Sequence, residues 1–533
     1  MSRTTMSLLF LATLATPLAA QRSRSRTPAQ APSADAVRTA AATITEADYR
    51  RRIYLIADDS MGGRGTPSPG LEKTAAYIAS EFQRLGLRPG GDSGTYFQRY
   101  PLRISALDSS SYVMAMGRGA HGHWLLGRDA LYFRTVGGAM PTGAVTGPLV
   151  LMAGLSADTT NPFGGVDVQG AVILYVPRAG ANMGPLAGRL QAAGARALIM
   201  LSEASSAFFQ RGAAAAFTPS VSRVGGPDTP GMPAFVVRDS AALGVLTAAG
   251  EDLAALRANG TPFAARALSG FTATFDIRRR VATETSAPNV IGILDGSDPT
   301  LRGEYVFLTA HMDHIGIAGA GNGCTARGAD SICNGADDDG SGTVGVLEAA
   351  QAFASLNPRP RRSVVFMTVS GEERGLWGSD YYTSHPTLPL DSTVADINMD
   401  MIGRYYNNQP GWRDTIVVIG KEHSSLGATA NAVTQQHPEL HMQLIDDIWP
   451  EERFYFRSDH YNFARRGVPI LFFFNGTHPD YHQVSDSPDK IDAEKASRVA
   501  QMAFYVVYDV ANTTERPQWN PESRRQIVQG ATQ

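Results

Sequence analysis

The chain has 533 residues, of which 43% are hydrophobic and 18% charged, and 47 basic against 50 acidic side chains give a net charge of −3. This length exceeds one ordinary hydrophobic core, so we expect a globular protein of two or three domains. The near-balance of charge gives no electrostatic case for a nucleic-acid partner. After the N-terminal segment no stretch is long and apolar enough to span a bilayer, so stable membrane insertion is not expected.

The first twenty residues have the pattern of a secretory signal peptide. Arg3 supplies a positive charge, residues 7–15 form a short apolar run, and small residues end at Ala20. The run is shorter than the ~20 residues that a spanning helix needs. The pattern therefore predicts export, to the periplasm or out of the cell, with a signal peptide over 1–20.

Residues 21–40 are rich in Ser, Arg, Ala and Pro and are expected to form a flexible leader. A first part of an α/β domain covers 41–105, where a Gly-rich loop precedes an amphipathic helix over 71–85 with apolar residues at helical spacing. Over 106–280 short β-like runs alternate with Gly, Pro and Ser turns, which indicates a smaller, β-rich α+β insertion.

From residue 281 to residue 512 the chain alternates between strand and helix patterns. The predicted strands cover 289–294, 305–310, 363–369, 397–399, 415–419 and 470–474, and the main helices cover 343–354 and 493–510. This alternation predicts an α/β fold with a mostly parallel mixed sheet flanked by helices. The polar tail 513–533 is expected to be disordered.

The two cysteines, Cys324 and Cys333, are nine positions apart. In an exported chain such a pair can close one small loop, and two cysteines without a second pair make a poor structural zinc site. The spacing favours a disulfide, with a pair of free thiols as the alternative.

Acidic and histidine residues gather where the predicted strands end. They are His311, Asp313 and His314 after 305–310, Glu372 and Glu373 after 363–369, Asp400 after 397–399, His478 and His482 after 470–474, and Asp337 to Asp339 before a helix. Open α/β sheets form their sites at the carboxyl ends of strands, so these side chains are expected to meet at one edge. Each fragment alone is common by chance, and only their conjunction is informative.

The residue types suit a pair of metal ions. Zinc accepts imidazole nitrogen and carboxylate oxygen. Two such ions ~3.5–4 Å apart need a carboxylate between them, and they make a shared water nucleophilic near neutral pH. A carboxylate that is not a ligand must then take the proton of that water and pass it to the leaving amine.

These segments resemble the M28 family of zinc peptidases, which contains aminopeptidases and glutamate carboxypeptidase. The resemblance covers about 45–100 and 287–512, and the matching segments are His311-Met312-Asp313, residues 335–342, Gly371-Glu372-Glu373, residues 398–403, Tyr481-His482, Arg64-Gly65-Thr66 and Ser68-Pro69-Gly70. The insertion resembles a protease-associated (PA) domain through Asp167-Val168-Gln169-Gly170, residues 192–195 and residues 232–237. In the family such domains lie beside the active site.

The resemblance implies two Zn²⁺ ions per chain and a role for each site residue. His311 and Asp400 would hold one zinc, Glu373 and His482 the other, and Asp338 would bridge them, with a cis peptide after Asp338. Glu372 would act as general base and then as acid on a zinc-bridging hydroxide. Asp313 would orient His311 through its other ring nitrogen, and Tyr481 would stabilise the oxyanion.

Other histidines compete with this assignment. His478 is four residues from His482, but the family spacing places the ligand directly after Tyr481. His314 and His460 lie near the motifs and are expected to be structural or substrate-lining residues and not ligands.

The expected function is removal of N-terminal residues from peptides. Carboxypeptidase or dipeptidase cleavage on the same site is the alternative, and a basic cluster near the metals, with Arg404, Arg453 and Arg457 as candidates, would favour it. A one-zinc glutaminyl-cyclase-like transferase and a non-catalytic binding scaffold are further alternatives. The sequence leaves the preferred side chain and the oligomeric state open.

Overall fold

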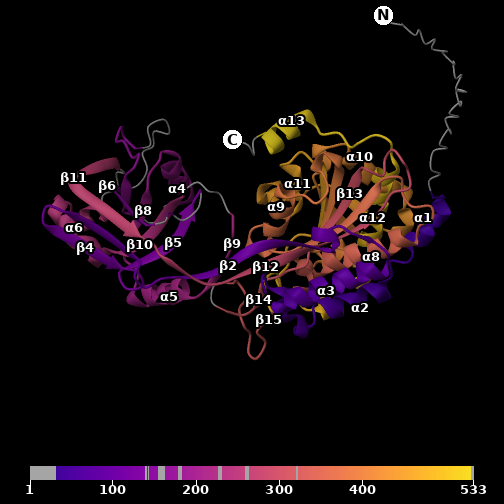
Figure 1. Ribbon diagram of the computed structural model, residues 1–533, viewed down its shortest axis with the longest axis horizontal. Helices are drawn as coiled ribbons and strands as arrows, with labels where there is room; N and C mark the ends of the chain where they lie inside the picture. Colours follow the sequence, from indigo (N-terminus) through magenta and orange to yellow (C-terminus); the bar gives the residue numbers. More distant parts are fainter. Residues whose placement is uncertain are drawn as a thin grey trace, which may run out of the picture.

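The computed structural model describes residues 32–137, 141, 143–153, 163–177, 183–225, 231–258, 263–319 and 322–529. The chain forms a larger and a smaller lobe, which the long strands β2 (Phe97–Leu107) and β12 (Arg279–Leu294) connect (Figure 1). The predicted signal peptide over 1–20 lies outside the described residues. No helix in the described part of the chain combines the length and apolar character needed to cross a membrane.

A mixed sheet of ten strands forms the centre of the larger lobe, counted over the described residues. Its order is β19-β18-β20-β17-β13-β16-β12-β2-β9, and β1 pairs with β12. The other strands are β1 (Arg88–Pro89), β9 (Ser220–Arg223), β13 (Tyr305–His311), β16 (Ser363–Val369), β17 (Thr393–Met399), β18 (Thr415–Ile419), β19 (Gln443–Ile445) and β20 (Ile470–Phe474). The pairs β16–β13, β13–β17 and β17–β20 are parallel, as is β18–β19, whereas the remaining pairs are antiparallel. The mixed, helix-flanked sheet is confirmed, with its parallel pairing concentrated in the four central strands.

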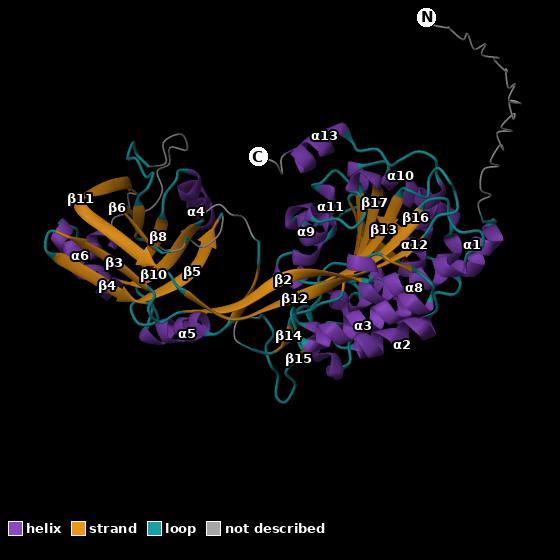
Figure 2. Cartoon of the chain, in the orientation of Figure 1, coloured by secondary structure: helices purple, strands orange, loops and turns teal. Residues whose placement is uncertain are grey.

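Helices cover both faces of this sheet (Figure 2). They are α1 (Ala34–Ala41), α2 (Glu46–Ile56), α3 (Pro69–Arg84), α8 (Gly342–Ser355), α9 (Trp377–Ser384), α10 (Leu426–Gln436), α11 (His460–Ala464), α12 (Ala493–Asn512) and α13 (Pro521–Arg524). One core lies under α2, α3, α8, α10 and α12, where Phe353 and Phe504 pack with ring centroids 4.5 Å apart. A second core on the other face contains Tyr382 of α9 and Phe463 of α11.

The sequence explains where helix α3 begins and which of its faces is buried. The side chain of Ser68 accepts a hydrogen bond from the Leu71 amide and so caps the helix, and Pro69 occupies the first turn, where its missing N–H is not needed. Leu71, Ala75, Ile78 and Phe82 are buried in one stripe. The predicted helix over 71–85 is confirmed within two residues at its start and one at its end.

The smaller lobe has its own eight-stranded sheet among the described residues, in the order β4-β3-β11-β6-β7-β8-β10-β5. Its elements are β3 (Tyr112–Gly117), β4 (Ala120–Leu125), β5 (Ala130–Val136), β6 (Ala144–Ala153), β7 (Val172–Tyr175), β8 (Ala197–Ser202), β10 (Met232–Arg238), β11 (Phe263–Asp276), α4 (Met183–Ala192), α5 (Ser206–Phe217), α6 (Asp239–Ala249) and α7 (Leu253–Ala258). All of them fall within 106–280, the range predicted for the insertion. Strand β9 also falls in this range but pairs with β2 in the larger sheet.

Two predictions about the ends of the chain are wrong where the structure describes them. The end of the expected leader forms α1, which Ser33 caps and which buries Val37, Ala40 and Ala41. The expected disordered tail contains α13, and the Trp519 indole N–H donates to the Gly467 carbonyl at 2.8 Å. Both segments are polar overall, and a few apolar side chains are enough to dock them on the larger lobe.

The predicted disulfide between Cys324 and Cys333 is present, with the two Cα atoms 6.0 Å apart. It joins the segment after β14 (Gly316–Ile317) to β15 (Ile332–Cys333), and these two short strands pair with each other. The disulfide therefore stabilises the long connection between β13 and the Asp-rich loop before α8.

Candidate active site

One edge of the larger sheet gathers the predicted site residues. Strands β13, β16, β17 and β20 end there, because parallel strands place their carboxyl ends on the same side. The loop before α8 reaches the same edge with Asp338. A pocket at this edge is lined by His311, Asp338, Glu372, Asp400 and Tyr481, among others.

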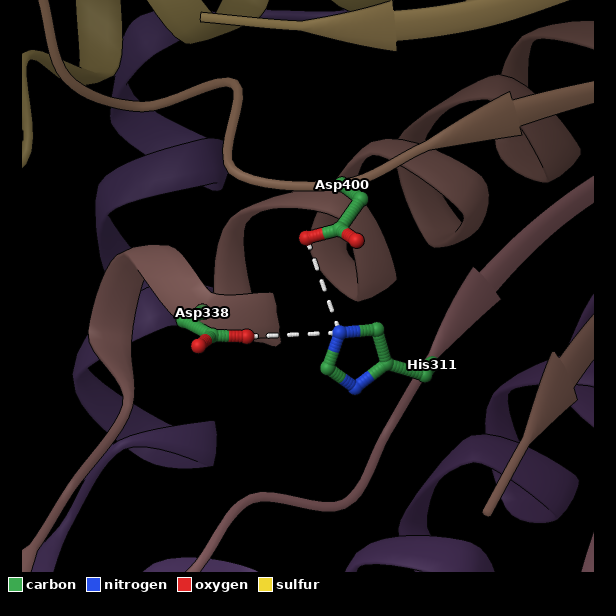
Figure 3. Close-up of side chains that lie close together, drawn as sticks. All are labelled: His311, Asp338 and Asp400. Atoms are coloured by element: carbon green, nitrogen blue, oxygen red, sulfur yellow. Dashed lines mark ion pairs between the residues drawn. The ribbon is translucent and has the colours of Figure 1, made fainter. Parts of the chain in front are cut away.

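Figure 3 shows the first group of possible metal ligands, which is His311, Asp338 and Asp400. All three residues are buried. The His311 Nε2 atom lies 3.3 Å from Asp338 Oδ1 and 3.5 Å from Asp400 Oδ1. The second oxygen of Asp400 accepts a hydrogen bond from the Ser458 hydroxyl at 2.9 Å. One oxygen of each carboxylate is thus directed toward the imidazole.

The second group lies on the other side of Asp338. It contains Asp338, Glu373 and His314. The His482 Nε2 atom is 3.2 Å from both Asp338 Oδ2 and Glu373 Oε2, so His482 joins this group as the resemblance implies. The His314 Nδ1 atom lies 2.7 Å from Glu373 Oε1 and 3.7 Å from Asp338 Oδ2. His314, expected to be structural or substrate-lining, thus lies among the candidate ligands.

Five of the six distances between possible ligands, 3.2–3.7 Å, fit ligands that share a cation, whereas the 2.7 Å between His314 Nδ1 and Glu373 Oε1 is shorter. Two ligands on one tetrahedral zinc, at ~2.0–2.2 Å from it, lie about 3.3–3.6 Å from each other. Asp400 Oδ1, Glu373 Oε1, His314 Nδ1 and His482 Nε2 are buried and have no hydrogen-bond partner among the described residues. Buried polar atoms without partners are rare in folded proteins because desolvation makes them unfavourable. The residues present therefore fit a divalent cation in each group.

The two carboxylate oxygens of Asp338 face different groups. Oδ1 is directed to His311, and Oδ2 is directed to His482 and His314. Neighbouring histidines, His314 first, hold the pKa of the Asp338 carboxyl well below its usual range despite burial, so this group stays ionised. An ionised carboxylate with one oxygen toward each group can bridge two cations.

Hydrogen bonds to the backbone fix the loop that carries Asp338. Its peptide bond to Asp339 is cis, as the resemblance implies. Asp486 accepts hydrogen bonds from the amides of Asp337 and Asp338 at 3.0 and 3.1 Å. Asp339 accepts hydrogen bonds from the amides of His311, Gly342 and Met401. A Cβ at Gly342 would lie 2.4 Å from Asp339 Oδ1, so this close approach requires glycine.

Asp313 supports the site by a different route from the one the resemblance implies. The His311 Nδ1 atom is 3.1 Å from the Asp313 carbonyl oxygen and makes its hydrogen bond there, whereas the Asp313 carboxylate lies 3.7 Å away. That carboxylate accepts hydrogen bonds from the Thr66 hydroxyl at 2.8 Å and from the Glu372 amide at 3.2 Å. Asp313 therefore orients His311 through its main chain and Glu372 through its side chain.

The Glu372 carboxyl lies on the wall of the pocket and is not in either group of possible ligands. Burial raises its pKa well above the usual range, and the carboxylates of Glu373 and Asp459 add to this rise against the effect of His311. A carboxyl that binds a proton readily can accept one from water and release it again.

Tyr481 lines the same pocket and stacks on His482, with ring centroids 3.9 Å apart. Burial, followed by the carboxylate of Asp338, raises the pKa of its hydroxyl. The hydroxyl therefore keeps its proton and remains a hydrogen-bond donor toward the pocket.

Apolar side chains and a single arginine form most of the remaining pocket wall, together with Ser458 and Thr477. Phe454, Phe472, Phe474 and Met401 line it together with Arg457. The other two basic candidates lie elsewhere: Arg404 pairs with Asp480 at 3.0 Å, and Arg453 lies over the Phe456 ring at 4.9 Å. Of the three candidates only Arg457 lines this pocket, so the described residues form no basic cluster there that would favour a carboxylate group.

Several supporting residues were not identified from the sequence. Ser458 and Asp486 hold a ligand and the ligand loop, yet a lone serine or aspartate gives no signal in a single sequence. Asp339 was noted only as a member of the Asp337–Asp339 run, and its supporting role was not identified. His478 faces Asp337 at 3.2 Å, away from both groups, and His460 contacts the Tyr455 carbonyl at 2.9 Å.

Comparison with known proteins agrees with this geometry. Residues 289–507 match peptidase family M28. This chain is 23% identical to aminopeptidase YwaD of Bacillus subtilis over a match that covers 45% of this chain and 48% of that protein. It is 26% identical to a probable leucine aminopeptidase of Arthroderma otae over a match that covers 42% of this chain and 58% of that protein. The chain thus spans about half the length of these curated relatives.

A solved structure supports the fold as a whole. The aminopeptidase of Aneurinibacillus sp. strain AM-1 superposes with a TM-score of 0.52 at 20% identity, over 90% of this chain and 97% of that one. At this identity the likeness bears on the fold alone. Residues 289–507 therefore resemble peptidase family M28 in sequence, and the chain resembles a solved aminopeptidase in its fold.

Proposed function

We propose that the protein is a two-zinc aminopeptidase that removes N-terminal residues from peptides. The observation that carries this proposal is Asp338, whose two carboxylate oxygens face two separate groups of possible metal ligands. The curated relatives described above are named as aminopeptidases, which supports the choice of reaction.

His311, Asp338 and Asp400 would hold one ion, and Asp338, Glu373 and His482 the other. Zinc bound there would lower the pKa of a coordinated water and polarise the scissile carbonyl. The protein contributes the fixed spacing of the ligands and a pocket whose wall contains the buried His311, Asp338 and Asp400.

Glu372 carries the proton in this proposal. It accepts a proton from the attacking water, whose oxygen bonds to the carbonyl carbon. When the C–N bond breaks, Glu372 passes this proton to the leaving amine nitrogen, so that it ends the cycle ionised again. Tyr481 donates its hydroxyl hydrogen bond to the oxyanion that forms.

The charge of the pocket favours a substrate with a free amine. The carboxyl groups of Glu372, Asp338 and Asp400 line it beside one arginine, Arg457. Arg457 is itself paired with Glu452 at 3.7 Å and lies over the Phe454 ring. The cationic N-terminus of a peptide matches these surroundings better than a free carboxylate does.

Two further proposals concern the rest of the chain. The smaller lobe would act as a PA-like domain that shapes access to the pocket, and the protein would be exported by the segment 1–20. Loss of the signal segment from secreted protein, read by N-terminal sequencing, tests the second of these.

The test of the proposed chemistry is Glu372→Gln. Glutamine keeps the shape of the side chain but cannot accept a proton, so kcat on aminoacyl amides should fall about 10²–10⁴-fold. Zinc content should stay at two ions per chain. The exposed Glu284, on β12, supplies the control Glu284→Gln. The proposal would be contradicted if Glu372→Gln kept the kcat of the wild type. It would also be contradicted if the wild type cleaved acyl-blocked dipeptides faster than aminoacyl amides.

A further inference from the structure

His314 occupies a position that the five-ligand scheme leaves without a role. It follows β13 on the same loop as Asp313, and it is 1% exposed. Its amide donates to the Arg64 carbonyl at 3.3 Å. A Cβ at Gly335, whose φ is +58°, would lie 2.4 Å from the His314 ring, so the ring is enclosed by backbone that only glycine permits. The imidazole is therefore held in one place.

The surroundings of the His314 Nδ1 atom are those of a metal ligand. It is 2.7 Å from Glu373 Oε1, yet neither atom has a hydrogen-bond partner among the described residues. One possible ligand atom each from His314, Asp338 and Glu373 lies within 4.8 Å of the other two, which is the arrangement of ligands around one ion. The 3.7 Å from His314 Nδ1 to Asp338 Oδ2 suits two ligands of one cation.

Glu373 connects His314 to the ligands already assigned. Its Oε1 faces His314, and its Oε2 faces His482 at 3.2 Å. The His314 and His482 rings meet edge to face, with centroids 5.6 Å apart. The two imidazoles thus approach the same carboxylate from different sides.

We propose that His314 Nδ1 is a ligand of the second cation, in addition to Asp338, Glu373 and His482. This inference rests on the proposed two-zinc function. The second ion then has four protein residues as ligands, whereas the first has His311, Asp338 and Asp400. The second ion is bound more tightly, and the first keeps the more open coordination for water and substrate.

The experiment uses the metal alone as probe. The full chain is stripped of metal and titrated with Zn²⁺ against a chelating dye, which resolves two binding steps. In His314→Leu the tighter step should weaken by about a hundredfold or more, above the 10–100-fold typical of residues that only orient a ligand. The weaker step should change by less than about threefold.

The controls separate this role from packing. His437 has a similar contact outside the site, with Nδ1 3.1 Å from Glu439 Oε1, so His437→Leu should bind both ions as the wild type does. If His314→Leu does not fold, as judged by its melting temperature, His314→Asn replaces it. X-ray absorption of the zinc-loaded wild type should show three imidazoles per two ions, and of the variant, two.

The outcomes are distinct. Either of two results would overturn the role of His314 alone. One is a folded His314 variant that binds two ions with unchanged affinities, and the other is a wild type that shows only two imidazoles per two ions. A wild type that does not bind two ions would overturn the proposed function together with this inference.

Discussion

At the scale of single residues, Asp339 holds together three backbone segments around the site by hydrogen bonds to their amides. Its carboxylate accepts one N–H from the end of β13, one from the start of α8 and one from the segment after β17, at 3.0, 2.8 and 3.1 Å. The side chain is fully buried. It therefore sets the mutual distances of His311, Asp338 and Asp400 without being a ligand.

Asp339→Asn should lower the free energy of unfolding by about 1–3 kcal/mol, because the amide nitrogen cannot accept and would leave a buried N–H unpaired. Urea unfolding of the zinc-loaded protein measures this, with the exposed Asp391→Asn as control. We also expect lower kcat, since the ligands lose their spacing. A variant as stable as the control would show that Asp339 does not hold these segments.

The same residues show what the sequence can predict. The positions of Asp338, Glu373 and Asp400 follow from strand ends and motif spacing, because the sheet brings those ends together whatever the loops do. The carbonyl of Asp313 as the partner of His311, and the direction of the His314 ring, depend on loop geometry to a fraction of an ångström. No pattern in one sequence encodes that.

At the scale of elements, helix α12 begins with an unusual buried lysine. Lys495, 0% exposed, lies in its first turn, donates to the Trp412 carbonyl at 3.1 Å and lies 5.2 Å from the centre of the Tyr405 ring. Asp492 caps the helix by accepting from the Lys495 amide. Burial lowers the pKa of the Lys495 ammonium to about 7.

This shift predicts a pH dependence of stability. Because the folded pKa of Lys495 lies below that of an unfolded lysine, the unfolded chain binds more protons between pH 7 and about 10.5, and Lys495 makes the free energy of unfolding rise with pH there. Lys495→Met should therefore stabilise the protein most at pH 7 and below. Its advantage should shrink toward pH 10. Denaturant unfolding at pH 7 and 9.5, with the exposed Lys73→Met as control, measures the difference, and an advantage that is constant with pH would exclude this cause.

The bounds of some strands were predicted more accurately than those of others, for a physical reason. The strands at 305–310, 363–369, 415–419 and 470–474 have continuous apolar runs, and the structure confirms them within one residue. Strand β12 instead begins ten residues before its predicted start, because residues 279–285 are exposed and pair with β2 through main-chain bonds that leave no periodic signal. Hydrophobic pattern predicts buried strands and misses solvent-exposed connections.

At the scale of the whole molecule, the two lobes have separate cores. The smaller lobe buries two clusters of its own, and the larger lobe buries two others around its sheet. The possible metal ligands all belong to the larger lobe. Among the described residues, main-chain pairing between these parts of the chain runs through β2, β9 and β12.

Removal of metal should therefore destabilise one lobe. Without cations, the buried carboxyl groups of Asp338, Glu373 and Asp400 repel one another, and the linkage free energy of each ion is lost. That linkage is about 2.7 kcal/mol per site at a free zinc concentration of 100 times the Kd. Calorimetry before and after chelation should show two unfolding transitions, of which only the larger lobe's moves to lower temperature, and added zinc should restore it. If both transitions moved together, the lobes would unfold as one cooperative unit, and β2 and β12 would have to transmit the effect of the ions to the smaller lobe.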